Sequence, residues 1–200
     1  MSEQREDPGP PILEAIARRW SPRAWADRPV EAQKLIACLE AARWGASSMN
    51  QQPWRFIVAT RDDQDDHERL AQCLKESNRA WARHAPVLML SACKETLDND
   101  DRPNRFAWHD TGLATAALMI QATALGLRVH AMGGFSRTKA REAFGVPDGF
   151  EPVAAIAMGY VGDPDSLPAE LRDPEIASRP RNPMTEWVFS GAWGLSAHLR

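Results

Sequence analysis

The sequence has few of the residues from which metal sites and disulfides are built. Its 200 residues include five histidines and three cysteines, Cys38, Cys73 and Cys93. The cysteines are scattered, and no Cys-x-x-Cys pair or paired Cys/His spacing occurs, so no structural zinc site is predicted. Cys38 and Cys93 lie within apolar patterns and are expected to be small core residues. A reducing cytoplasm is therefore the predicted compartment.

The chain also lacks the patterns of secretion, membrane insertion and nucleic-acid binding. No basic start followed by a long apolar run is present, so we expect no secretory signal. The longest apolar run, Leu113 to Leu127, is shorter than the roughly 20 residues of a membrane span and predicts a helix buried on most sides. The net charge of -3 offers no general field for nucleic acid or acidic membranes.

Several catalytic motifs are missing as well. No GxGxxG follows a predicted strand, no GxxxxGK[ST] phosphate loop occurs, and no GxSxG nucleophile elbow is present. His109 and Asp110 are adjacent, but neighbours on a helix are not expected to face each other. The sequence therefore gives no support to a Ser/His/Asp hydrolase.

The hydrophobic pattern that is present predicts one domain, residues 12–200, after a flexible start at residues 1–11. The expected helices lie at 12–17, 30–44, 62–74, 113–126 and 137–145, and the expected strands at 54–59, 86–93, 128–132 and 151–161. The strand at 86–93 is continuously apolar, which indicates cover on both faces. One apolar face of the helix at 30–44 is expected to contain Ala32, Leu35, Ile36 and Leu39.

Helices on both faces of one sheet fit this order of elements, but the pattern does not decide between parallel and antiparallel pairing. From Gly162 onward the chain is punctuated by prolines and has little core pattern. Residues 162–200 are therefore expected to run as a tail along a surface, which could belong to another subunit.

Two basic clusters suggest anion binding. Arg19-x-Ser21-x-Arg23 lies in a proline-broken connector, and residues two apart share a face of an extended chain. Two guanidiniums and a hydroxyl on that face would suit a phosphate. The segment Arg179-Pro180-Arg181 holds two more arginines in a fixed relation, because its proline restricts the backbone. When each cluster is taken alone, solvated surface charge is the simpler explanation of it.

Two uncharged segments complete the set. Ser47 to Gln52 places five hydrogen-bonding side chains within six positions between a helix and a strand, more than an ordinary connection needs. Gly133 and Gly134 follow another predicted strand, and a double glycine lets a ligand approach backbone N–H groups closely. A plain turn also accounts for the glycines.

The order of these clusters resembles the nitroreductase family of FMN-dependent oxidoreductases. RWSPR, a helix, ASSMNQQPWRFIV, GGF and RPRNP follow one another between about Arg18 and Trp193. The segment SSMNQQPW is the most specific part, whereas RxSxR and RPR gain weight from their positions. Ala46 is a departure, because family members often have proline there. The resemblance implies an α+β homodimer, with a mixed sheet wrapped by helices, FMN at the interface and a C-terminal tail that reaches across to the partner.

The resemblance also implies a set of FMN-binding residues. Carried over by position, these are Arg19, Ser21, Arg23, Ser47, Ser48, Asn50, Asp110, Gly133, Gly134, Arg179 and Arg181. The arginines and Ser21 would hold the phosphate and the polar edge of the ring, and Arg19 or Arg23 would stabilise negative charge on reduced flavin. The serines and Asn50 would reach the flavin of the neighbouring subunit, and the glycines would present N–H groups near N5.

Further residues are weaker candidates for the same site. Asp110 matches a position that contacts the flavin or its ribityl chain, and Asn78 also belongs to the candidates. Four aromatic residues could shape the open face of the flavin, although core packing explains each of them too: Trp54, Trp81, Phe106 and Trp108. The charged loop 94–105 is read either as a gate for substrates or as a solvated loop.

The implied reaction passes hydride from NADH or NADPH through flavin N5 to an acceptor such as a nitroaromatic or quinone, in alternating half-reactions. The cofactor carries the hydride, so no catalytic side chain and no metal is predicted. One alternative is a flavoprotein of the same fold that cleaves flavin or removes halogen. Another is a protein that binds flavin without turnover or has lost the cofactor. The sequence does not select between NADH and NADPH.

Overall fold

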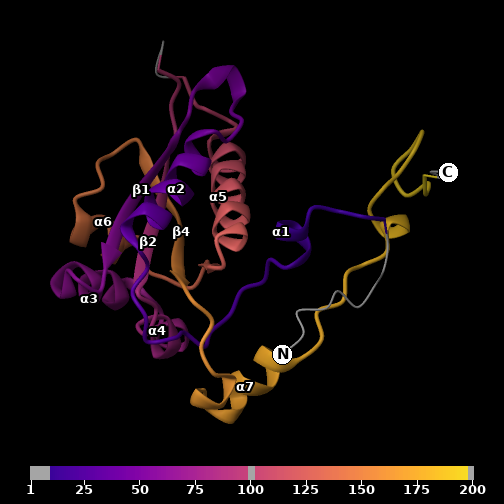
Figure 1. Cartoon of the computed structure of the whole chain (residues 1–200). Coiled ribbons are helices and arrows are strands. Elements are labelled where there is room, and N and C mark those ends of the chain that lie inside the picture. Colours follow the sequence, from indigo (N-terminus) through magenta and orange to yellow (C-terminus); the bar gives the residue numbers. More distant parts are fainter. Residues whose placement is uncertain (1–9, 99–101, 198–200) are drawn as a thin grey trace.

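The computed structural model describes residues 10–98 and 102–197 (Figure 1). Its centre is a sheet in the order β1-β2-β4-β3, formed by β1 (Trp54–Thr60), β2 (Val87–Lys94), β3 (Arg128–Met132) and β4 (Phe150–Gly159). All three pairings are antiparallel, so the parallel pairing of a mixed sheet does not occur among the described strands. The α+β class is confirmed. Of the start expected to be flexible, residues 1–9 lie outside the described ranges.

Helices surround this sheet in the order that the sequence predicts, with two additions. They are α1 (Glu14–Ala17), α2 (Ala32–Arg43), α3 (Gln64–Cys73), α4 (Glu76–Ala82), α5 (Ala107–Ala124), α6 (Arg137–Phe144) and α7 (Ala169–Ile176). Helices α4 and α7 have seven and eight residues, too few for a recognisable periodic pattern, and were not expected from the sequence. Helix α5 begins at Ala107, before the apolar run that predicted it. Its first turn is polar, so the apolar pattern did not indicate this part of the helix.

The central strand β2 is covered on both faces, as its apolar run predicts. Val87 and Met89 pack in the layer formed with α2 and α5, whereas Leu88 and Leu90 pack in the layer formed with α3, α4 and α6. Alternate side chains of a strand point to opposite faces, so one short run supplies both layers. Each such buried side chain contributes about 1.5–3 kcal/mol relative to exposure. The sheet is therefore the rigid support from which the loops described below extend (Figure 1).

Helix α2 packs against α5 along a face that agrees only in part with the one expected, since Leu35 and Leu39 belong to both. The expected apolar face contained Ile36, but this side chain is 63% exposed. The inward residues are spaced along the helix at Leu35, Cys38, Leu39 and Ala42. Because each residue turns the helix by about 100°, a stripe through these positions leaves Ala32 and Ile36 at its edge. The close approach ends at Gly45, where a Cβ would lie 2.9 Å from the Ala114 Cα atom.

The C-terminal tail leaves the sheet after β4 and passes through α7 away from the body of the molecule (Figure 1). All of residues 160–197 are described, and Glu175 is the single buried residue among them. Large apolar side chains of the tail are exposed instead: Ile176, Met184, Trp187, Trp193 and Leu195. The low core content of the tail agrees with its sequence, and its contact with a second subunit remains a prediction. No helix among the described residues is long and apolar enough to cross a membrane.

Candidate functional site

Guanidinium groups from the two ends of the chain lie close together. Arg19 follows α1, and its Nη1 atom donates a hydrogen bond to Ser21 Oγ over 3.3 Å. Burial lowers the pKa of Arg19, and the nearby charges of Arg181 and Arg179 lower it further. The guanidinium of Arg179 also lies 4.7 Å from the centre of the Trp20 ring. We call Arg19, Ser21, Arg179 and Arg181 the arginine group.

Two guanidiniums of this group, those of Arg19 and Arg181, have no carboxylate partner among the described residues. Within residues 10–98 and 102–197, neither Arg19 nor Arg181 forms an ion pair with a carboxylate. Arg181 donates instead to the backbone carbonyls of Arg179 and Pro180. Gathered like charges repel one another, and a bound anion would lower that cost. A phosphate suits such a group because it accepts several charge-assisted hydrogen bonds from guanidiniums.

Arg23, the third charged or polar residue of the RxSxR motif, has a different environment. Its Nη1 atom lies 3.7 Å from Glu175 Oε2, and its backbone N–H donates to the same carboxylate. The charge of Arg23 is therefore already paired, whereas that of Arg19 has no carboxylate partner among the described residues. Between the two possibilities left open by the motif, Arg19 is the better candidate for an unpaired positive charge in the site.

Strand β3 connects this region with the double glycine. His130 of β3 contacts the carbonyl oxygen of Pro22 through Nδ1 over 2.9 Å. Burial lowers the pKa of His130, and the positive charges of Arg23 and Arg19 lower it further. The strand that ends at Met132 thus lies beside residues Arg19–Arg23, which we call the arginine connector. Two of the segments singled out in the sequence are neighbours within one chain.

The turn after β3 is shaped by Asn78. The carbonyl oxygen of Gly134 accepts hydrogen bonds from Lys75 N–H (2.9 Å) and from Asn78 Nδ2 (3.1 Å). A Cβ on Gly134 would lie 2.4 Å from that Nδ2 atom, so a larger residue would displace the Asn78 side chain from the turn. The N–H groups of Gly133 and Gly134 donate to no acceptor in the described part of the chain. Both are therefore available to a ligand, and Asn78 acts through the turn.

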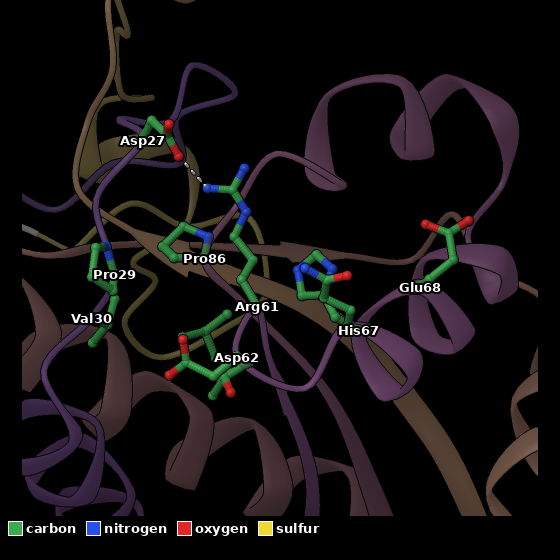
Figure 2. Close-up of a pocket in the computed structure, with 11 residues that line it drawn as sticks. Asp27, Pro29, Val30, Arg61, Asp62, His67, Glu68 and Pro86 are labelled. Atoms are coloured by element: carbon green, nitrogen blue, oxygen red, sulfur yellow. Dashed lines mark hydrogen bonds and ion pairs between the residues drawn. The ribbon is translucent and has the colours of Figure 1, made fainter.

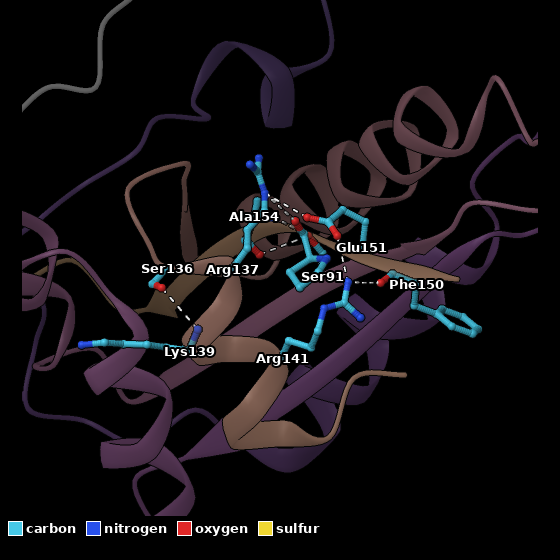
Figure 3. Close-up of polar contacts among 9 residues, drawn as sticks. Ser91, Ser136, Arg137, Lys139, Arg141, Phe150, Glu151 and Ala154 are labelled. Atoms are coloured by element: carbon cyan, nitrogen blue, oxygen red, sulfur yellow. Dashed lines mark hydrogen bonds and ion pairs between the residues drawn. The ribbon is translucent and has the colours of Figure 1, made fainter. Parts of the chain in front are cut away.

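Helix α6, which follows this turn, is fixed to the sheet by ionic contacts (Figure 3). Arg141 Nη2 lies 2.9 Å from Glu151 Oε2 on β4, and Arg137 Nε lies 3.5 Å from Oε1 of the same carboxylate. The Ser136 hydroxyl accepts from Lys139 N–H and caps the helix. These contacts hold the end of the glycine turn in place.

The polar segment Ser47 to Gln52 is held by a buried carboxylate. It contains a 3-10 turn, η1 (Ser48–Asn50), and the N–H of Ser48 donates to Asp110 Oδ2 over 2.8 Å. Asp110 is 2% exposed and lies in the first turn of α5. The structure therefore brings together two predicted site residues, and it assigns Asp110 the role of orienting the loop.

The expectation that His109 and Asp110 do not face each other is wrong. His109 Nδ1 lies 2.9 Å from Asp110 Oδ1. The contact is possible because both residues are in the first turn of α5, where no preceding turn of helix occupies the space. Since the other oxygen of Asp110 accepts from Ser48, this pair is part of the loop support rather than of a hydrolytic triad.

The loop also carries backbone strain that the sequence did not indicate. Met49, Asn50 and Gln52 have φ values of 53°, 56° and 46°, and no other non-glycine residue of the described chain has a positive φ. Such a conformation costs roughly 1–2 kcal/mol for an ordinary side chain, and strain of this kind concentrates at functional sites. Part of the polarity serves the loop itself, because Ser47 Oγ accepts from Gln52 N–H over 3.0 Å.

Replacing Met49 with glycine is expected to raise the free energy of unfolding by about 0.5–1 kcal/mol, because glycine adopts a positive φ without the Cβ clash. Urea unfolding of the flavin-free protein measures the change. The control is M184G, since Met184 is also exposed but has no positive φ, and this change should not stabilise the protein. Equal effects of the two substitutions would contradict the assignment of strain to Met49.

The four aromatic candidates divide into two pairs. Trp54 and Trp81 are 8% and 2% exposed and belong to the core layers, so core packing explains them. Phe106 and Trp108, at the start of α5, are 53% and 43% exposed. The guanidinium of Arg137 lies 5.4 Å from the centre of the Trp108 ring. Only the second pair is available to a substrate in this chain.

The loop and the arginine group share no polar contact in the described chain. No hydrogen bond or ion pair between described residues joins Ser47–Asn50 to Arg19 or Arg181. The loop is held by Asp110 of α5, whereas the RxSxR segment lies beside β3.

A cavity of about 560 Å³ lies elsewhere, beside the end of β1 (Figure 2). Arg61 Nη1 lies 2.7 Å from Asp27 Oδ1 at its edge, and the His67 ring contacts the Ala85 carbonyl oxygen over 2.9 Å. Burial lowers the pKa of His67, which favours the neutral ring. None of the predicted FMN-binding residues lines this cavity. Arg61 and Asp27 at its edge are paired with each other, and no site is assigned to the cavity.

Metal and thiol chemistry receive no support from the described residues. No group of three or more histidine, cysteine, aspartate or glutamate side chains among them could hold a metal ion. All three cysteines are buried, and burial raises the pKa of the Cys38 and Cys93 thiols to about 11. The expected core role of Cys38 and Cys93 is confirmed.

Known proteins share both the sequence pattern and the fold. The profile of the nitroreductase family matches residues 16–160. A solved structure of an oxidoreductase containing FMN is 33% identical, with a TM-score of 0.90 and a match over 98% of this chain and 99% of its own. A nitroreductase family protein from Clostridium difficile 630 is 28% identical, with a TM-score of 0.71 over 91% of this chain and 99% of its own.

Sequence relatives agree with this result. An uncharacterised 15.4 kDa protein from Mycolicibacterium smegmatis is 35% identical over 147 residues, which are 70% of this chain and 97% of the relative. A protein from Methanothermobacter thermautotrophicus, provisionally named NADH dehydrogenase/NAD(P)H nitroreductase, is 27% identical over 168 residues, or 82% of this chain and 84% of the relative. The chain belongs to the nitroreductase family.

Proposed function

We propose that this protein is an FMN-dependent oxidoreductase that passes hydride from NADH or NADPH to a small acceptor such as a nitroaromatic or quinone. The observation that carries the proposal is the arginine group, in which Arg19 and Arg181 gather without a carboxylate partner in the described chain. The FMN phosphate carries close to two negative charges and accepts several hydrogen bonds, so it matches this group in charge and chemistry.

The turn after β3 is the second feature that supports FMN binding. Gly133 and Gly134 offer backbone N–H groups without an acceptor in the described chain, and donors of this kind would orient a flavin ring. Arg19 would add positive charge beside the polar edge of that ring and favour its reduced, anionic form. Bound FMN would supply the N5 atom that accepts and donates hydride. The protein would bind, orient and tune the cofactor.

A homodimer with FMN at the interface is part of the proposal. Ser47, Ser48 and Asn50 would approach the flavin bound by the partner's arginine group, since no hydrogen bond or ion pair in the described chain joins them to their own Arg19 or Arg181. The exposed apolar side chains of the tail would be covered by the second copy, which reduces their contact with water. Asp110 would hold the loop in the shape that reaches across.

The proposed substrates are inferred from the exposed side chains of this site and from the names of relatives. A nicotinamide donor is supported by the provisional name of the Methanothermobacter relative. Phe106 and Trp108 provide exposed aromatic surface near the start of α5, which suits a flat acceptor. These residues do not distinguish NADH from NADPH.

The test is the visible spectrum of the purified protein, reconstituted with FMN, before and after NADH or NADPH is added without oxygen. Loss of the flavin band, and its return when a quinone or nitroaromatic is added, would support the proposal. A yellow protein that neither nicotinamide bleaches would favour a flavoprotein of other activity. A protein that takes up no FMN at all would overturn the proposal.

A further inference from the structure

The buried carboxylate of the tail is unexplained by the features described so far. Glu175 is 5% exposed, while every other residue from 160 to 197 is partly or fully exposed. A carboxylate is costly to bury without partners, and apolar tail residues such as Trp187 and Trp193 would be expected to be buried before it. Burial of Glu175 in preference to them therefore requires a specific interaction.

That interaction is with the arginine connector, 152 positions earlier in the chain. Glu175 Oε1 accepts from the N–H groups of Arg23 (2.8 Å) and Ala24 (3.0 Å), and Oε2 accepts from Arg23 N–H over 3.0 Å. The Arg23 guanidinium lies 3.7 Å from Oε2. A charged carboxylate forms such bonds more strongly than a neutral acceptor.

The connector is held from its other side by the start of the tail. The N–H of Gly162 donates to the Ala24 carbonyl oxygen over 2.9 Å, and a Cβ on Gly162 would lie 2.5 Å from the backbone of Trp25. The tail therefore leaves the sheet in contact with the connector and returns to it at Glu175. Beyond Glu175, no described residue of the tail is buried.

The consequence concerns the arginines that follow. Arg179 and Arg181 lie four and six residues after Glu175, so an extended chain carries them at most about 14 and 22 Å from that contact. Their mutual repulsion with Arg19 would drive the tail away from the connector whenever no anion is bound. The attachment at Glu175 opposes this repulsion and lies just before the tail arginines.

We propose that Glu175 is a positioning residue that joins the C-terminal tail to the Arg19–Arg23 connector and so assembles the arginine group before FMN binds. The inference rests on the proposed FMN site, but the attachment of the tail can be tested without flavin. Glu175 acts through the backbone of Arg23 and Ala24 and is not assigned a contact with the cofactor.

The first experiment measures trypsin cleavage at the Arg181–Asn182 bond in the flavin-free, full-length protein. Glu175→Gln puts an amide donor opposite backbone donors, so cleavage should be about ten- to hundredfold faster than in the parent protein. Glu170→Gln is the matched control, since Glu170 is an exposed residue of the same helix, and its cleavage rate should equal that of the parent. Unchanged cleavage in E175Q would overturn the inference.

The second experiment titrates the same proteins with FMN and follows the quenching of flavin fluorescence. E175Q should bind FMN about ten- to hundredfold more weakly, and E170Q should bind it like the parent. Faster cleavage with unchanged FMN affinity would contradict a role in assembling the site. Loss of the cooperative thermal transition in E175Q would also contradict it, because Glu175 would then support the core. If the parent binds no FMN while the cleavage difference persists, the proposed function fails and the attachment by Glu175 stands.

Discussion

Replacing Arg19 and Arg181 together with glutamine is expected to weaken FMN binding by about a hundred- to ten-thousandfold. A charge-assisted hydrogen bond is worth about 1.5–3 kcal/mol, and each substitution would remove at least one such bond between the arginine and the phosphate. Each single substitution should cost roughly ten- to hundredfold in affinity. Equilibrium titration with FMN measures these affinities, and the loss should shrink at high salt because screening weakens the interaction between charges.

The stability of the flavin-free protein should move in the opposite direction. Arg19 and Arg181 have no carboxylate partner in the described chain, so removing them relieves repulsion and should not lower the free energy of unfolding. R172Q is the control, since Arg172 lies in the same tail and is paired with Asp165 at an exposed position. Unaltered FMN affinity in the double variant would exclude the arginine group as the phosphate site.

The second large effect is expected at Asp110, whose replacement by alanine should lower the free energy of unfolding by about 2–3 kcal/mol. The substitution leaves Ser48 N–H without its acceptor and removes the support of a loop that contains three residues with positive φ. FMN affinity should fall as well, because the loop would leave the conformation in which it reaches the partner's flavin. Urea unfolding of the flavin-free protein and titration with FMN measure the two effects separately.

Two further variants separate the contacts of Asp110. D110N retains one oxygen that can accept from Ser48, so its loss of stability should be smaller than that of D110A. H109A removes only the contact with the 67% exposed His109 side chain, and a change within about 0.5 kcal/mol is expected for such a surface position. If H109A were as destabilised as D110A, the loop contact would not be the main role of Asp110.

The strands and the longer helices could be predicted from the sequence because their patterns are local. The apolar run at 86–93 and the long run ending near Gly126 both reflect burial within a single element, and both elements occur close to the expected positions. Short helices such as α4 and α7 escaped prediction because one or two turns do not establish a period. The inward face of α2 was predicted only in part, because a small turn of the helix about its axis decides whether Ile36 is covered.

The family could be predicted from the sequence, but the arrangement of the candidate site could not. RxSxR, SSMNQQPW, GG and RPR could be recognised in order, and the chain belongs to the family that this order resembles. The positive φ values of Met49, Asn50 and Gln52 had no sequence signal, since glycine or a run of asparagines would have been the usual indication. Glu175 had none either, because an acidic residue in a charged tail is ordinarily solvated.

By itself, the sequence determined which residues of this protein have the charge and hydrogen-bonding capacity that suit an anion and which segments must be buried, because these properties belong to each side chain. The tertiary structure decided which of them meet. Arg19 is 162 positions from Arg181, and Ser48 is 62 positions from Asp110, so only chain folding brings the two arginines near each other and Ser48 into contact with Asp110. It also decided that, among the described residues, the buried carboxylate of Glu175 pairs with Arg23 and not with Arg19.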